Sequence, residues 1–139
     1  MKPLVTALID TYDHERYIEQ ALVSVIEQGL SPAELEIVVV DDGSTDMTPS
    51  IIQKFAPRVK NVRKNNGGQA SAFNTGFAQA HGELVAFLDG DDWWAAKKLA
   101  KVIMPWRVIS MQRPSATDTT NFTRRPMRRG FVFRQNDHL

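Results

Sequence analysis

Two clusters of aspartates are the residues most able to do chemistry in this 139-residue chain. Residues 41–46 place three carboxylates on a Gly-Ser-Thr turn, and residues 89–92 place three carboxylates around Gly90. Carboxylates crowded on a tight turn repel one another unless a cation shares the site. Hard oxygen ligands suit Mg2+ or Mn2+, and these ions usually hold a substrate phosphate as well. The two clusters therefore predict an enzyme that handles a nucleotide.

Each cluster follows an apolar run, at residues 37–40 and at residues 84–88. A short β-branched run that ends in carboxylates is typical of a buried parallel strand that delivers acid groups to one edge of a sheet. An isolated Asp-x-Asp is more often a solvated turn, but the strand and the other cluster favour a metal site. Asp91 is the first choice for a ligand, with Asp89 and Asp92 as partners or ribose contacts.

Other polar residues near the predicted strand ends have two possible roles each. Asp42 can accept hydrogen bonds from a base or ribose while its neighbours shape the turn. Tyr12 can stack on a nucleobase, and a packing role is the alternative. Backbone N–H groups of residues 66–69, at the start of a helix, favour an anion. The pair Trp93 and Trp94 is expected to pack under the next helix, with one ring left to border a sugar pocket. The histidines show no partner spacing and receive no catalytic role: His14, His81 and His138.

Hydrophobic periodicity and turn residues predict strands and helices that alternate along the chain. The expected strands are residues 4–9, 35–40, 59–63 and 83–88, and the expected helices are residues 15–28, 48–55, 70–80 and 97–104. This alternation predicts an α/β fold with an open, mainly parallel sheet and helices on both faces. With strand order 3-2-1-4, the polar residues after strands 1, 2 and 4 share one edge, where such sheets bind ligands.

The composition is that of an ordinary globular protein, with 42% apolar and 24% charged residues. The absence of cysteine excludes disulfides, thiolate zinc sites and a cysteine nucleophile. No apolar run approaches the length of a membrane span, and the N-terminus lacks a signal-peptide core. The expected location is therefore cytoplasmic.

The small net charge of +1 conceals a change of composition near residue 106. Residues 1–106 hold ten basic and fourteen acidic residues, whereas residues 107–139 hold seven arginines, no lysine and two aspartates. We therefore expect one domain over residues 1–106, and a basic tail over residues 107–139 that is irregular or non-native. The arginines could indicate nucleic-acid or lipid contact. The tail lacks interleaved aromatic residues, so no nucleic-acid partner is expected.

Taken together, these motifs resemble the N-terminal half of the family 2 glycosyltransferases, which have the GT-A fold. The resemblance spans about residues 3–104, and its motifs keep the family's order. The matching segments are Thr11-Tyr12, residues 15–18, residues 36–46, residues 66–69, Asn74 with Gly76, and residues 87–93. Residues 1–106 would then be an incomplete GT-A-like nucleotide-sugar-binding domain with a Rossmann-like half.

The resemblance implies inverting transfer of a sugar from a nucleoside diphosphate donor, usually a UDP-sugar, to an acceptor hydroxyl. It also implies a divalent ion, Mg2+ or Mn2+. By this likeness Asp89 lies near the ribose or the metal, Asp91 contacts the ion that bridges the diphosphate, and Asp92 completes the metal ligands. The implied nucleotide-sugar contacts are Thr11, Tyr12, Asp13, Asp42, Asn66, Gly68, Asp89 and Asp91.

Three departures from the family pattern bear on activity. Asp10 stands where many members have proline, and Phe73 stands where an arginine is frequent. The family's catalytic base and acceptor site lie beyond the metal motif, and residues 107–139 show no version of either, so the base is unassigned. We hypothesise a truncated reading frame or an altered C-terminus.

Two alternatives to a working transferase stay open from the sequence. One is a truncated, inactive fragment that binds nucleotide. The other is a nucleotidyltransferase or an aspartyl phosphatase, which fits less well because residues 89–93 lack the phosphatase threonine and residues 8–13 are acidic rather than basic and Gly-rich. The donor sugar, the acceptor and the oligomeric state are left open.

Overall fold

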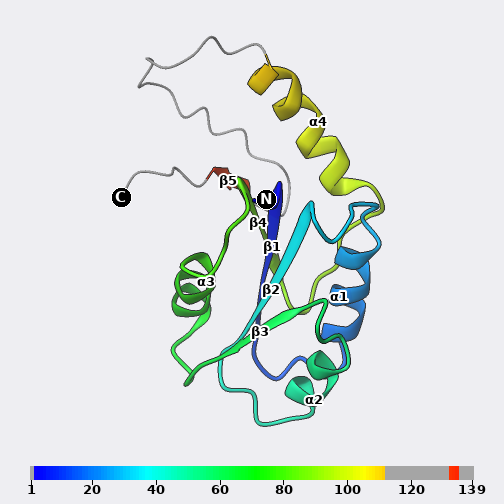
Figure 1. Cartoon of the computed structure of the whole chain (residues 1–139). Coiled ribbons are helices and arrows are strands. Elements are labelled where there is room, and N and C mark those ends of the chain that lie inside the picture. The colour runs from blue at the N-terminus through cyan, green and yellow to red at the C-terminus, as the bar shows by residue number, and fades with distance from the viewer. Residues whose placement is uncertain (1, 112–131, 135–139) are drawn as a thin grey trace.

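The fold is an open five-stranded sheet with the strand order β3-β2-β1-β4-β5 and helices on both faces (Figure 1). The computed structural model describes residues 2–111 and 132–134. The strands are β1 (Val5–Thr11), β2 (Leu35–Asp41), β3 (Lys60–Arg63), β4 (Leu84–Asp89) and β5 (Val132–Arg134), and the helices are α1 (Ile18–Ile26), α2 (Thr48–Gln53), α3 (Gln69–Phe77) and α4 (Lys98–Met111). Each element predicted from the sequence is present, and the predicted strand order 3-2-1-4 is confirmed.

The first four strands are parallel, whereas β5 runs antiparallel to β4. No strand was expected after residue 106, yet β5 pairs with β4 from Leu84↔Arg134 to Ala86↔Val132. The helix α4 also runs beyond its expected end at residue 104 to Met111. The rest of the predicted tail, residues 112–131 and 135–139, lies outside the described residues, so the domain boundary at residue 106 stays a prediction.

The sheet separates two apolar cores, because successive side chains of a strand point to opposite faces. On one face Val5, Ala7 and Ile9 of β1 pack with α1, α2 and α4. On the other face Leu8 packs with Ala72 of α3 and with apolar residues of β2 and β4. Figure 1 shows α3 on one side of the sheet and α1 and α2 on the other. All seven residues of β1 are buried, including the polar residues Thr6, Asp10 and Thr11, because the strand lies in the middle of the sheet with both faces covered.

Helix α3 lies unusually close to the sheet because Gly76 faces it. A Cβ placed on Gly76 would lie 2.2 Å from Leu8 Cδ1 and 2.8 Å from Val40 Cγ2, inside the contact distance of carbon atoms. Leu8 and Val40 are both fully buried, so neither side chain has free space to move into. The contact fixes the distance between α3 and strands β1 and β2.

The register of the strands brings their carboxyl ends to one edge. Asp10 of β1 is the Cα partner of Asp89 of β4, and Thr11 of β1 is the partner of Asp41 of β2. The aspartate clusters after β2 and β4 therefore flank β1 at the same end of the sheet. This is where the direction of winding reverses, the place at which open α/β sheets bind ligands. Within the described residues, no helix has the length and apolar character needed to cross a membrane.

Replacing Gly76 by alanine should destabilise the fold. Overpacking a filled core costs about 1–3 kcal/mol, whereas the gain in helix propensity from glycine to alanine is about 1 kcal/mol. The net loss should appear as a lower denaturant midpoint with an unchanged slope in urea unfolding. Asn74→Ala, at an exposed position of the same helix, is the matched control and should change the free energy of unfolding by no more than about 0.5 kcal/mol. Equal midpoints for the two variants would show that the contact at Gly76 is not tight.

Candidate functional site

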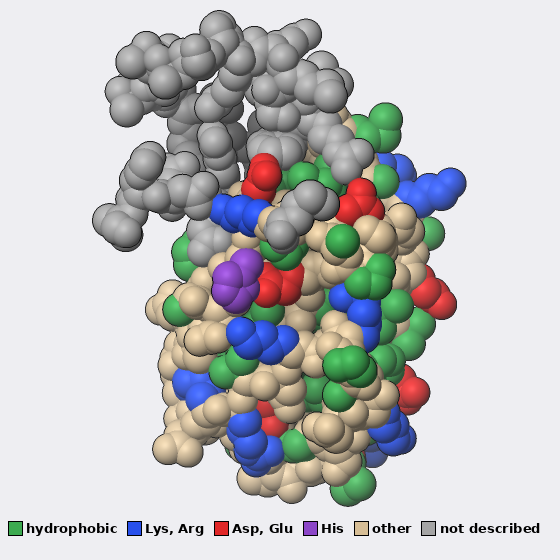
Figure 2. Space-filling view, in the orientation of Figure 1, with side chains coloured by type: hydrophobic (Ala, Val, Ile, Leu, Met, Phe, Trp, Pro, Cys, Tyr) green, Lys and Arg blue, Asp and Glu red, His purple; other side chains and the backbone are tan. Residues whose placement is uncertain are grey.

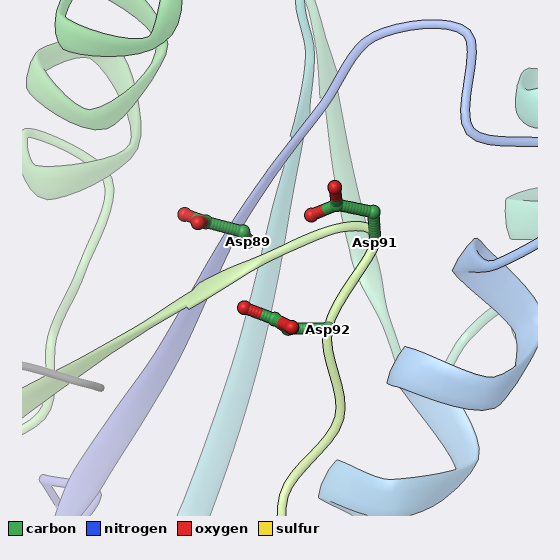
Figure 3. A group of neighbouring side chains, drawn as sticks. All are labelled: Asp89, Asp91 and Asp92. Carbon is green, nitrogen blue, oxygen red and sulfur yellow. The ribbon is translucent and has the colours of Figure 1, made fainter. Parts of the chain in front are cut away.

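The turn after β4 gathers three carboxylates that can hold a metal ion. One oxygen each from Asp89, Asp91 and Asp92 lies within 4.8 Å of the others. Figure 3 shows the three side chains leaving the backbone toward the same side of the turn (Figure 3). The N–H of Asp92 donates to the Asp89 carbonyl oxygen over 3.0 Å, which closes the turn. This is the predicted ligand set, and its hard oxygen donors fit Mg2+ or Mn2+.

Gly90 lets this turn lie directly against the end of β1. Its N–H donates to the carbonyl oxygen of Asp10 over 2.8 Å. A Cβ on Gly90 would lie 2.7 Å from that oxygen and 2.8 Å from both His14 Nδ1 and Thr11 Oγ1. No side chain fits at Gly90 without displacing these groups, so the turn of residues 89–92 packs directly against the end of β1 and the loop after it.

Asp10 adds a fourth carboxylate at this edge, buried beside Asp89. Only 8% of Asp10 is exposed. Burial and the neighbouring charge of Asp89 raise the pKa of Asp10 to about 7. Burial, followed by the charges of Asp91 and Asp92, raises the pKa of Asp89 as well. Crowded carboxylates with raised pKa values hold their charge at a cost, and a bound cation would remove that cost.

One side-chain amide lies between these two carboxylates. Gln69, the first residue of α3, brings its Nε2 to 2.8 Å from Asp89 Oδ1 and to 3.4 Å from Asp10 Oδ1. An amide nitrogen carries two donor hydrogens, one for each carboxylate. Gln69 thereby connects the helix on one face of the sheet to the acidic edge.

The carboxylate of Asp42 is buried and accepts several hydrogen bonds. Its donors are Lys64 Nζ at 2.7 Å, the N–H of Gly67 at 3.0 Å and the N–H of Gly68 at 2.8 Å. Burial acts to raise the pKa of Asp42, but the hydrogen bonds from Lys64, Gly68 and Gly67 outweigh it and lower the pKa below its ordinary value. Asp42 is thus an anion held at the start of α3.

Asp42 and Asp89 meet at consecutive residues of that helix start. Gly68 donates to Asp42, and the next residue, Gln69, donates to Asp89. The carboxylates after β2 and β4 are therefore joined through two neighbouring residues. These two hydrogen bonds connect the two acidic clusters, which the sequence predicted to lie at one edge of the sheet.

A second set of hydrogen bonds joins the loops after β1 and β2. The N–H of Asp13 donates to Ser44 Oγ over 2.9 Å, and the N–H of Thr45 donates to Asp13 Oδ1 over 2.7 Å. The N–H of Glu15 donates to Asp46 Oδ2 over 3.1 Å. Asp13, predicted as a nucleoside contact, lies at this edge with its carboxylate engaged by the neighbouring loop.

The remaining predicted residues differ in exposure. Thr11 is buried with its Oγ1 3.2 Å from His14 Nδ1, whereas Asn66 is exposed. The ring of Tyr12 is 43% exposed, so it is available to a ligand. Trp94 is buried at 4% exposure, as expected for a packing residue. Trp93 is 59% exposed and therefore does not pack under the next helix.

Sequence reasoning assigned no side-chain function to Asp10, His14, Lys64 or Gln69, although all four contact the site. Asp10 could have been found from strand register, because it ends β1 level with Asp89. His14 could not have been found in this way, because it lies close to the turn of residues 89–92 only where Gly90 has no side chain. The role of Gln69 depends on where α3 begins in space, which the sequence does not state.

The face of the molecule that Figure 2 shows carries mixed charge. Acidic and basic side chains lie scattered among other residues there, without one acidic surface (Figure 2).

Comparisons with known proteins agree with this geometry. The chain is 44% identical over 103 residues to an uncharacterized glycosyltransferase of Nostoc sp., which covers 71% of this chain and 31% of that protein. It is 38% identical over 92 residues to the poly(ribitol-phosphate) beta-N-acetylglucosaminyltransferase TarS of Staphylococcus aureus, covering 63% of this chain and 16% of TarS. The chain thus spans less than a third of the length of either relative.

Solved structures show the same fold. The mannosyltransferase PcManGT of Pyrobaculum calidifontis, in complex with GDP-Man and Mn2+, superposes with a TM-score of 0.67 at 35% identity, over 74% of this chain and 32% of that one. S. aureus TarS in complex with UDP-GlcNAc gives a TM-score of 0.69 at 34% identity, over 78% of this chain and 32% of that one. The family model for glycosyl transferase family 2 matches residues 6–138, and the chain therefore belongs to that family.

Proposed function

We propose that this chain is the donor-binding part of a metal-dependent, inverting glycosyltransferase, with a UDP-sugar as the expected donor. The observation that carries the proposal is the group of three carboxylates from Asp89, Asp91 and Asp92. One oxygen of each lies within 4.8 Å of the others, at the edge of the sheet where the direction of winding reverses. The names of two similar structures support it, since one is a complex with GDP-Man and Mn2+ and the other a complex with UDP-GlcNAc.

In this proposal Asp89, Asp91 and Asp92 hold Mg2+ or Mn2+. The bound cation would neutralise charge on the diphosphate as it leaves the sugar. Asp89, at the end of β4, also lies where it can accept a hydrogen bond from the ribose. Gly90 lets the turn pack against β1, so the three proposed metal ligands are held at the end of a strand rather than on a loop without support.

The nucleoside is expected on the side of the edge formed by β1 and β2. Tyr12 offers an exposed ring for stacking on the base. Asp42 stays ionised because its pKa is lowered, and its carboxylate, held by Lys64 and by the N–H groups of Gly67 and Gly68, is proposed to line this side of the edge. The other residues proposed for this side are Thr11, Asp13, Asn66 and Gly68.

Transfer also needs a base that deprotonates the acceptor hydroxyl as it attacks the anomeric carbon. No residue is assigned to that role, and the acceptor is unknown. Donor binding without transfer is the second candidate function, since no described residue is assigned as the base. The two candidates differ in one readout, the release of sugar from UDP-sugars in the presence of acceptors.

Calorimetric titration with UDP tests the donor site. Wild type should bind UDP in the presence of Mn2+ and lose that binding in EDTA. Asp91→Asn removes a charged ligand and should weaken Mn2+-dependent binding at least tenfold, since even outer partners of metal ligands contribute about 10–100-fold.

Glu19→Gln, which removes a carboxylate from the exposed face of α1, is the matched control and should bind as wild type does. A folded wild-type protein that binds no nucleoside diphosphate with Mn2+ would refute the proposed function.

The pH dependence of stability should reveal Asp10. Its pKa in the folded protein is about 7, above the ordinary value of 3.8, so the folded state holds a proton that the unfolded chain has released. Without metal, the free energy of unfolding should therefore fall as pH rises from about 4 to about 7. Asp10→Asn keeps the shape and removes the titration, so its stability should change less over this range. Urea unfolding of both proteins at several pH values measures the difference, and parallel curves would contradict the raised pKa.

A further inference from the structure

Two carboxylates, those of Asp10 and Asp89, lie on neighbouring strands at the edge of the sheet that carries the proposed metal ligands. Asp10 and Asp89 are Cα partners in the parallel pairing of β1 and β4. Asp10 is buried, and Asp89 is one of the three clustered ligands. A carboxylate in such a crowded position takes a defined orientation when a hydrogen-bond donor holds it.

Gln69 supplies that donor. Its Nε2 lies 2.8 Å from Asp89 Oδ1 and 3.4 Å from Asp10 Oδ1. We propose that Gln69 is a positioning residue for the metal site: its amide bridges Asp10 and Asp89 and sets the orientation in which Asp89 meets the cation. This inference rests on the metal site of the proposed function, and it assigns to Gln69 no contact with the substrate.

The amide of Gln69 can orient a carboxylate because α3, the helix that carries it, is held firmly against the sheet. Gly76 lets α3 lie against Leu8 and Val40, where its position along the sheet is set by close contact. Asp42 accepts the N–H groups of Gly67 and Gly68, the two residues directly before Gln69. The first residue of α3 therefore has little freedom to move, and a side chain anchored there can orient a carboxylate.

The hydrogen bond from Gln69 uses one of the two oxygens of the Asp89 carboxylate. Oδ1 accepts the amide hydrogen from Gln69, so the carboxylate is held in one rotation about its χ2 bond. In this rotation one oxygen of Asp89 lies within 4.8 Å of one oxygen each from Asp91 and Asp92. Without the amide, Asp89 loses the hydrogen bond that fixes this rotation. The loss should fall on metal affinity rather than on folding, because Gln69 itself is exposed.

The test compares the affinity for Mn2+ alone, measured from the electron paramagnetic resonance signal of free Mn2+. Gln69→Leu replaces the amide with a branched apolar side chain that is one atom shorter, which removes both donors, and Mn2+ binding should weaken about 10–100-fold. Gln69→Asn keeps an amide on a shorter side chain and provides a second variant that cannot reach both carboxylates. Gln79→Leu is the control, since that glutamine pairs with Lys60 away from the proposed metal ligands. Thermal unfolding of each variant in EDTA confirms that all are folded.

The inference is supported if both Gln69 variants lose Mn2+ affinity while Gln79→Leu does not, with equal unfolding temperatures in EDTA. It is overturned if Gln69→Leu binds Mn2+ as wild type does, if Gln79→Leu loses as much affinity, or if wild type binds no Mn2+. The UDP titration is a separate arm. A wild type that binds Mn2+ but no nucleoside diphosphate refutes the proposed function, and the comparison of Gln69→Leu with wild type for Mn2+ alone still decides the role of Gln69.

Discussion

Repulsion between carboxylates at one edge of the sheet is the constraint to which the surrounding structure responds. Asp89, Asp91 and Asp92 lie close together, and Asp10 is buried beside them. In water such groups would move apart, but here they are fixed by strand register and by a turn that is hydrogen-bonded to β1. Burial, followed by the charges of the neighbouring carboxylates, raises the pKa values of Asp10 and Asp89. A buried and crowded group of carboxylates gains more from a divalent cation than an exposed one would.

The same edge contains one carboxylate in the opposite electrostatic state. Asp42 is also buried, yet its pKa is lowered because Lys64 and two backbone N–H groups donate to it. The β2 side of the edge therefore carries a carboxylate that three donors stabilise, and the β4 side carries carboxylates that lie close to one another. In the proposed function, the diphosphate and its cation lie on the β4 side.

The sequence predicted the elements and their order well, because apolar runs, helical spacing and turn residues are local signals. It also predicted that Asp42, Asp89 and Asp91 would share an edge, since parallel topology brings strand ends together. It did not predict β5, whose three residues form a strand only through pairing with β4. It gave no side-chain role to Gln69 or His14, because their contacts arise from the closeness of α3 to the sheet and from the missing side chain of Gly90. It did not state which of Trp93 and Trp94 packs in the core, and the structure buries Trp94 and leaves Trp93 exposed.

The hydrogen bonds between the loops after β1 and β2 have a consequence for the kinetics of ligand capture. Asp13, Ser44 and Thr45 hold the two loops together through hydrogen bonds of the chain itself. A loop pair held in this way loses little conformational entropy when a small molecule binds beside it. Encounter should then proceed as docking onto a rigid surface, with an association rate governed by diffusion and charge rather than by a slow rearrangement of the loops.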